Sequence, residues 1–209
     1  LSELIDSDGI QRGVSPDFKD AFVVSDETVK AEQLEKGWIK TTVTGGYDVR
    51  KYAIINKSKK LIYTSKKDDP KEIPNIVKYI SGFKNKITCK EVSEGKHPFY
   101  ALHRERDEKI FTKEEKIVGV ITGDRIIVAI DTDKIYPTDG LYLFSGNKKV
   151  SNKYLVAILN SKLVTYLYRL FSFEEGRVLA QIKPSILEDL PVPEISVLDQ
   201  RPFIEKVNE

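Results

Sequence analysis

The sequence predicts an α+β fold, in which a mixed, mostly antiparallel, twisted sheet packs against two or three helices. Two observations predict it. Short runs of β-branched and aromatic residues, bounded by Gly, Asn or Asp, recur along much of the chain and are typical of strands. Helical spacing of apolar residues is confined to a few places, so the strict strand–helix alternation of a parallel α/β sheet is absent.

The first half of the chain predicts three strands and one helix. The runs "AFVVSD", "KYAIIN" and "KLIYT" have strand character, and the last two are expected to form a hairpin around residues 56–60. Pro74 suits the first turn of a helix, and the apolar residues after it have helical spacing. This pattern predicts a helix of about three turns over residues 74–87.

The second half predicts four strands followed by helices. The strand runs are "FYALH", "KIVGVIT", "RIIVAID" and "GLYLFSG". Ser151 is expected to cap a long helix through "YLVAILNSKLVTYLYRLFSF", in which Asn160 and Lys162 fall off the apolar stripe. That stripe comprises Leu155, Ile158, Leu159, Leu163, Tyr166, Leu167 and Leu170. A short helix over residues 184–190 and the start of another from Asp199 complete the chain.

Composition favours a soluble globular protein, since 40% of the 209 residues are hydrophobic and 32% are charged. The longest apolar segment is broken by Asn160, Lys162 and Arg169, so no membrane span is expected. Cys89 is the only cysteine and no basic-then-apolar leader is visible, which favours a reducing cytoplasm. Because the chain opens on Leu1 and contains no Met, we expect it to be an internal piece of a longer protein.

The charges are unevenly distributed. The net charge is only +2, but residues 50–90 hold 12 Lys and Arg against 3 Asp and Glu. Such a segment is a candidate surface for a polyanion such as nucleic acid, and the alternative is an ordinary solvated lysine face.

Patterns typical of catalysis or metal binding are not found along the sequence. The paired glycines of "TGGYD" lack the spacing and context of a nucleotide-binding loop. His97 and His103 have no Cys or carboxylate neighbour at metal-ligand spacing, so packing or surface roles are expected and no metal. Asp131 and Asp133 could hold a divalent ion, but a turn after a strand explains them as well. By itself the chain is therefore expected not to be catalytic.

Several segments, taken in order, resemble one family. They are "IQRGVSPDFKDAFVV", "TGGYDVRKY", "FYALH", "EEKIVGVIT", "YLVAILNSKLVTYLYRL", "ILEDLPVPEI" and "DQRPFIEKV". Together they resemble the C-terminal specificity, or target-recognition, domain of Taq-type adenine-N6 DNA methyltransferases and type IIG restriction–modification enzymes. Specificity subunits of type I restriction systems are related to it. Tyr47 and Glu115 depart from the pattern, because the family usually has Arg and often has Pro at these places.

The resemblance implies that residues 1–195 form a DNA target-recognition domain and that residues 196–209 begin a further helix. Such a domain would hold double-stranded DNA and read base edges, while a separate methyltransferase domain or subunit, which binds S-adenosylmethionine, acts on adenine. It also implies a structural role for the polar triplet of the long helix, with Asn160 and Ser161 satisfying backbone groups and Lys162 reaching the surface.

The candidate DNA contacts lie on loops and in the basic segment. They are Thr42, Thr44, Tyr47, Arg50, Lys51, Ser65, Lys66, Lys67, Arg104, Arg106, Lys109 and Arg177. Arg104 and Arg106 are candidate readers of guanine, against the alternative that they pair with the acidic residues among 105–108. The alternative function is a type I-like specificity half that docks methyltransferase subunits through the "LNSKL" helix and the terminal helix.

Overall fold

The computed structural model describes residues 1–208. The strands are β1 (Gln11–Arg12), β2 (Val23–Val24), β3 (Ile39–Thr42), β4 (Val49–Arg50), β5 (Ala53–Ile54), β6 (Lys59–Ile62), β7 (Lys116–Val120), β8 (Val128–Asp131) and β9 (Leu141–Phe144). The helices are α1 (Lys19–Phe22), α2 (Asp26–Ala31), α3 (Pro74–Ser81), α4 (Lys90–Ser93), α5 (Glu108–Phe111), α6 (Asn152–Leu159), α7 (Lys162–Ser172), α8 (Pro184–Glu188) and α9 (Arg201–Asn208). Two short 3-10 helices are η1 (Lys36–Trp38) and η2 (Lys84–Lys86).

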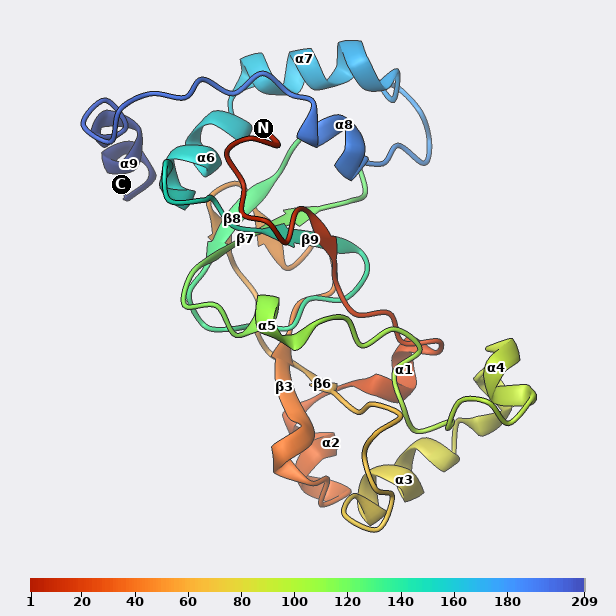
Figure 1. Ribbon diagram of the computed structural model, residues 1–209. Coiled ribbons are helices and arrows are strands. Elements are labelled where there is room, and N and C mark those ends of the chain that lie inside the picture. Colours follow the sequence, from red (N-terminus) through yellow and green to blue (C-terminus); the bar gives the residue numbers. More distant parts are fainter. Residues whose placement is uncertain (209) are drawn as a thin grey trace.

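The chain is drawn out into two lobes (Figure 1). A four-stranded antiparallel sheet of order β1-β9-β7-β8 is the framework of the larger lobe. Ile117 of β7 faces the core that α6, α7 and α8 cover, and its neighbour Val118 faces the opposite core, as the two-residue period of a strand requires. Val43 and Val49 cover this second face, so the turn between β3 and β4 rests on the side of the sheet away from the helices.

The smaller lobe is built on a three-stranded antiparallel sheet of order β2-β6-β3. Its core joins Leu61 and Ile62 of β6 to Ile76 and Ile80 of α3, which lie one helical turn apart. Strand β3 belongs to this sheet, yet Val43, the residue after it, is buried in the larger lobe. The two lobes are therefore connected through β3.

Much of the predicted architecture is confirmed. The fold is α+β, and every paired strand runs antiparallel, although the strands form three sheets. Strands β7, β8 and β9 lie within the runs predicted for them, and Pro74 and Pro184 begin helices. The side chain of Ser151 caps α6 by accepting a hydrogen bond of 3.2 Å from the backbone N–H of Lys153.

The hairpin expected around residues 56–60 is wrong. Strand β5 instead pairs antiparallel with β4, the strand before it, through a tight turn in which Tyr52 has a φ of 72°. Strand β6 pairs instead with β3 and β2, because Leu61 and Ile62 are buried in the core of the smaller lobe. Burial of distant partners thus overrode the local hairpin signal.

Three other predicted elements need correction. "FYALH" is not a strand: isolated hydrogen bonds fasten it, from the Leu102 N–H to the Thr64 carbonyl at 2.9 Å and from the Thr64 hydroxyl to the Tyr100 carbonyl at 2.6 Å. Helix α3 ends at Ser81, and Gly82 precedes η2, so the predicted helix over residues 74–87 is too long. "AFVVSD" contains the end of α1 before the two-residue strand β2.

The long C-terminal helix is in fact two helices, because Asn160 ends α6 and Ser161 caps α7. Buried Asn160 accepts from the Val128 N–H at 3.1 Å and donates to the Val128 carbonyl at 2.9 Å, thereby extending the edge strand β8. The structural role expected for Asn160 and Ser161 is confirmed. The break also turns α7, so that Val164 and Tyr168 meet the core, while Leu163, Tyr166 and Leu170 of the expected apolar stripe are exposed.

We expect Asn160→Ala to lower the free energy of unfolding by about 2 kcal/mol, because it leaves the buried N–H of Val128 without a partner, whereas the Val128 carbonyl still accepts from the Tyr52 N–H at 3.0 Å. Denaturant unfolding measures this change. The matched control is Asn208→Ala, since Asn208 contacts only Lys153 at the exposed end of α9. Equal stability of the two variants would contradict the assigned role of Asn160.

Helix α9 packs on α6, with the rings of Tyr154 and Phe203 5.3 Å apart and edge to face. Buried Gln200 accepts from the Ser151 N–H at 2.9 Å and donates to the Lys149 carbonyl at 3.0 Å, so the start of α9 is fastened to the start of α6. Within residues 1–208, no helix combines the length and apolar character needed to cross a bilayer.

Candidate functional site

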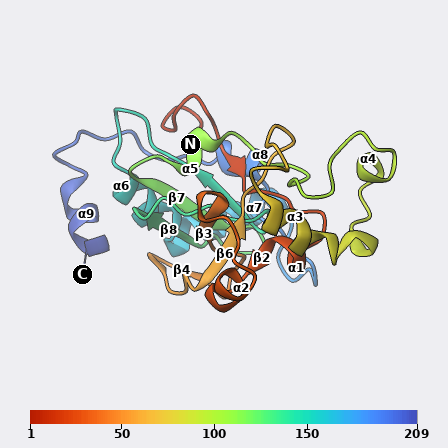
Figure 2. The ribbon, with the colours of Figure 1, turned by 90° about the horizontal axis from the view of Figure 1, so that it is seen from below.

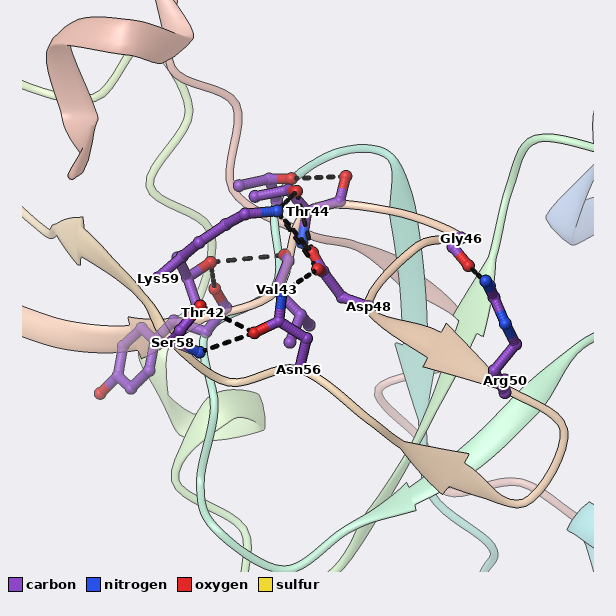
Figure 3. Close-up of polar contacts among 11 residues, drawn as sticks. Thr42, Val43, Thr44, Gly46, Asp48, Arg50, Asn56, Ser58 and Lys59 are labelled. Carbon is purple, nitrogen blue, oxygen red and sulfur yellow. Dashed lines mark hydrogen bonds and ion pairs between the residues drawn. The ribbon is translucent and has the colours of Figure 1, made fainter. Parts of the chain in front are cut away.

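The most highly organised polar site lies at the turn between β3 and β4 (Figure 3). Asp48, with 1% of its surface exposed, is the centre of this turn. Its carboxylate accepts hydrogen bonds from the backbone N–H of Thr44 at 2.7 Å, the Thr44 hydroxyl at 2.9 Å and the Asn56 side chain at 3.1 Å. The ammonium of Lys59 lies 3.0 Å from the same carboxylate. We call residues 44–48 the Asp48 turn.

Electrostatics keep the Asp48 carboxylate ionised. Burial acts to raise its pKa, but the hydrogen bonds from Thr44 and Lys59 outweigh burial, and the pKa lies below the ordinary aspartate value. An ionised acceptor makes stronger hydrogen bonds than a neutral one. The Asp48 turn is therefore held as a rigid base for the side chains that it carries.

The Asp48 turn presents Tyr47 to solvent. Its side chain is 89% exposed, and Gly45 has no heavy atom within 4 Å of the place where a Cβ would lie, so the backbone there is open to a ligand. Arg50 is exposed, and its guanidinium donates a hydrogen bond to the Gly46 carbonyl, which closes the turn (Figure 3). The structure thus places two candidate residues, Tyr47 and Arg50, on one ordered surface.

The threonines of this region have structural roles. Thr42 is fully buried and its hydroxyl donates to the Tyr136 carbonyl at 2.6 Å, so it is not at the surface as a DNA contact requires. Thr44 is half-buried, and its N–H and hydroxyl groups both donate to Asp48.

Lys51 belongs to a basic group near the end of α6. It donates to the Asn160 carbonyl at 2.6 Å and so caps α6. Together with Lys162, Arg125 and Arg169 it lines a hollow of about 310 Å³. Sequence reasoning missed this basic group, since its members are far apart in the chain.

A second group of candidates surrounds a hollow of about 500 Å³ in the smaller lobe. Ser65, Lys67 and Arg106 line it, together with Trp38 and Lys40, which sequence reasoning did not single out. The turn carrying Ser65 and Lys67 is ordered, because the Ser65 N–H donates to Asp68 at 2.6 Å and the Lys67 N–H donates to the Ser65 hydroxyl at 3.1 Å.

The floor of this hollow is aromatic. The ring of Tyr63 meets that of Tyr136 edge to face at 4.9 Å, and Lys40 lies over the Tyr136 ring at 5.6 Å. Burial raises the pKa of Tyr63, so its hydroxyl stays protonated and donates to the Glu105 carbonyl at 3.3 Å. This bond ties residues 104–107 to the hollow.

Arg104 and Arg106 differ in how they are held. Arg106 has a φ of 67°, and its Nε donates to the Gly13 carbonyl at 3.2 Å. Burial lowers the pKa of Arg106, and nearby Arg104 contributes to the same effect. Arg104 is exposed beside Lys66 in an adjoining hollow. Across residues 1–208 neither arginine forms an ion pair, so the expected pairing with Glu105, Asp107 or Glu108 is wrong.

The remaining candidates lie apart from both groups or at their margins. Lys109 is exposed at the start of α5 and lines a hollow with Arg106. Arg177 follows α7 and pairs with Glu174 at 3.0 Å, and it lines neither hollow of the smaller lobe.

Asp131 and His103 are possible metal ligands from the sequence, and the structure shows what surrounds each of them. Asp131 forms a buried ion pair with Lys116 and accepts from the Ile135 N–H at 3.0 Å, so a turn after a strand explains it. His103, in contrast, has neighbours that its sequence spacing did not reveal. The fold brings it beside Cys89 and Glu91, with the three ligand atoms within 4.8 Å of one another.

Comparisons with known proteins agree on one kind of domain. Residues 41–192 match the sequence model of the TaqI-like C-terminal specificity domain. The fold is similar to part of the type IIL restriction–modification enzyme MmeI, solved in complex with DNA, with a TM-score of 0.68 and 13% identity over 96% of this chain and 27% of that one. It is also similar to part of the type IIG restriction endonuclease BpuSI, with a TM-score of 0.53 and 11% identity over 96% of this chain and 25% of that one.

The chain thus spans about a quarter of the length of each enzyme. No curated protein matches it.

Proposed function

Because this chain belongs to the family of TaqI-like C-terminal specificity domains, we propose that it recognises a specific sequence in double-stranded DNA. It is a specificity domain of the kind found in restriction–modification enzymes. In the proposal it positions the duplex so that a separate methyltransferase domain methylates adenine at N6. S-adenosylmethionine belongs to that domain: in this chain the paired glycines Gly45 and Gly46 lie between two strands, which does not suit a nucleotide-type cofactor.

The observation that carries the proposal is a set of cations without acidic partners. Lys66, Lys67, Arg104 and Lys109 take part in no ion pair with any residue of the described chain. Unpaired cations that border adjoining hollows are suited to DNA phosphates. This favours a polyanion over a solvated lysine face.

We divide the contacts by the geometry of each side chain. Lys66 and Lys67 are exposed on a turn and carry point charges, so we assign them to phosphates, which position the duplex. Tyr47 stands on the rigid Asp48 turn, and exposed Arg104 follows a segment fastened at Leu102, so we assign these two to base edges. Thr42 is left out because it is buried.

Replacing both Lys66 and Lys67 by Ala is expected to weaken binding to all duplexes alike. The slope of log K against log salt should flatten by about 0.9 for each phosphate that is no longer neutralised. Fluorescence anisotropy over a salt series measures the slope. Lys148 and Lys149, an adjacent exposed pair in the turn before α6, provide the matched control and should leave it unchanged. Equal slopes for both double variants would show that Lys66 and Lys67 are only a solvated face.

Arg104→Ala is expected to relax the preference at one base pair, with discrimination falling by about 1–3 kcal/mol. Arg106→Ala is the matched comparison, because Arg106 is tied to the Gly13 carbonyl. It should lower stability and leave the base preference intact. Binding to a panel of single-base variants of the preferred site separates the two. A uniform weakening on every duplex with Arg104→Ala would assign it to phosphate instead.

In this proposal residues 1–195 form the DNA-recognition unit, and α9 lies in the segment after it, residues 196–209.

A second candidate function, docking of a methyltransferase domain or subunit, is favoured by one observation. Helix α7 and the loop after it expose apolar side chains: Leu163, Tyr166, Leu170, Phe171, Phe173, Val178 and Leu179. Such a patch is typical of a protein contact. Charged substitutions in α7 that abolish copurification with the methyltransferase unit, but not duplex binding, would establish this role.

A further inference from the structure

In the segment between α3 and α5, residues 88–98 take no part in the hydrophobic cores. Apart from η2 and α4, residues 82–107 form no regular structure, and most side chains of residues 84–96 are exposed. Figures 1 and 2 both show α4 at the edge of the smaller lobe, away from the sheets. Long loops with little secondary structure are uncommon in compact domains and are usually either functional or disordered.

Three metal-ligating side chains meet inside this segment. The Cys89 sulfur, a Glu91 carboxylate oxygen and a His103 ring nitrogen all lie within 4.8 Å of one another. The Cys89 backbone is fixed, because its N–H donates to Asp17 at 2.9 Å. None of the three side chains forms a hydrogen bond or an ion pair elsewhere in residues 1–208, so each is available to a ligand.

A fourth donor lies close by. The ring centre of His97 is 6.4 Å from that of His103, and the Nε2 atom of His97 is buried without a hydrogen-bond partner. A buried ring nitrogen of this kind ordinarily finds a partner, so its isolation is a second sign of a ligand at this place. Sulfur, imidazole and carboxylate together are a ligand set that suits zinc, with four ligands in a tetrahedron.

We propose that Cys89, Glu91 and His103 bind a zinc ion, with His97 as a nearby fourth donor. The thiolate and the carboxylate bring two negative charges, which neutralise the charge of the ion beside Lys66, Arg104 and Arg106, which line the same hollow. The ion connects the start of α4 to the residue before Arg104. It thereby closes a loop in which residues 90–98 lie outside the hydrophobic cores, and zinc binding contributes to the order of this segment.

Cobalt(II) absorption tests the site directly. Cys89 is the only cysteine in the chain, so a thiolate-to-cobalt charge-transfer band in the near ultraviolet reports on this residue alone. Titrating cobalt into metal-free, reduced protein should give the band at one ion per chain, with visible bands of tetrahedral intensity, and zinc should displace it. Cys89→Ser should abolish the band.

The other ligands have matched variants. Glu91→Gln and His103→Ala should each weaken cobalt binding at least about tenfold. Glu94→Gln, in the same turn of chain, should leave it unchanged, since Glu94 pairs with Lys96 at 2.6 Å. Circular dichroism of the metal-free proteins confirms that each variant is folded. In addition, zinc should raise the thermal stability of the unmodified protein and not of Cys89→Ser.

The proposal is overturned if no thiolate band forms at stoichiometric cobalt. It is equally overturned if the band persists at full strength in the folded His103→Ala protein, because Cys89 would then bind metal without this cluster. Neither result bears on DNA binding, which is measured separately.

Discussion

Asp131→Ala is expected to lower the free energy of unfolding by about 3–5 kcal/mol, because it leaves the ammonium of Lys116 as an unpaired charge in the core. Both side chains of the pair are completely buried. Lys116 also donates to the Phe111 carbonyl at 2.8 Å, so the pair joins β7 and β8 to the end of α5. Urea unfolding followed by circular dichroism measures the decrease.

Two further variants separate charge from packing. Asp133→Ala is the matched control: its ion pair with Lys57 is exposed, and exposed pairs contribute roughly 0–1 kcal/mol. Replacing both partners, as Lys116→Met with Asp131→Leu, should recover part of the stability, since no charge is then left buried, while the N–H groups of Asp133 and Ile135 still lack their acceptor. A single Asp131→Ala variant as stable as Asp133→Ala would contradict the role given to the pair.

Asp48→Ala is expected to lower stability by about 3 kcal/mol, because it removes an ionised acceptor from Thr44, Asn56 and Lys59 at once. It should also remove the sequence preference that Tyr47 provides, since Tyr47 depends on the Asp48 turn. Unfolding and duplex binding measure the two effects. Asp69→Ala, at an exposed turn residue whose side chain accepts only from the Lys71 N–H, is the matched control.

The contribution of Asp48 should depend on pH with a defined sign. Its pKa is lower in the folded protein than the ordinary value of about 3.9, so the carboxylate stabilises the fold fully above that pH. The stabilisation is lost as the pH falls through the lowered folded value. The stability difference between the unmodified protein and Asp48→Asn should therefore be constant near neutrality and shrink below about pH 4. A difference that grows in acid would contradict the ionised, hydrogen-bonded state.

The sequence predicted correctly those elements whose formation depends on residue type and on neighbours within a few positions. The strands β7, β8 and β9 are buried on both faces, so they stand out in the sequence as continuous runs of β-branched and aromatic residues. Pro74 and Ser151 mark helix starts by chemistry that acts within a few residues. "KLIYT" had the right character but the wrong partner, since its pairing with β3 is chosen by the distant core of α3.

The candidate site was predicted less completely, for the same physical reason. The resemblance located the Asp48 turn through "TGGYDVRKY" but did not reveal that Asp48 organises it or that Thr42 is buried. Arg104 and Arg106 look alike in "HRERDEK", yet a bond to distant Gly13 distinguishes them. Cys89 and His103, fourteen positions apart, meet only because the loop returns on itself.

Reading of a DNA sequence through Tyr47 on the Asp48 turn and through Arg104, with Lys66 and Lys67 on phosphates, is the central claim made for this domain. Incubating the protein with a pool of randomised duplexes, at several salt concentrations, and sequencing the bound fraction tests it most directly. We expect enrichment of one short motif; Asp48→Ala should lose the preference at the positions that Tyr47 reads, while Asp69→Ala should retain the whole motif. Retention of duplexes without any enriched motif, or no retention even at low salt, would contradict the claim.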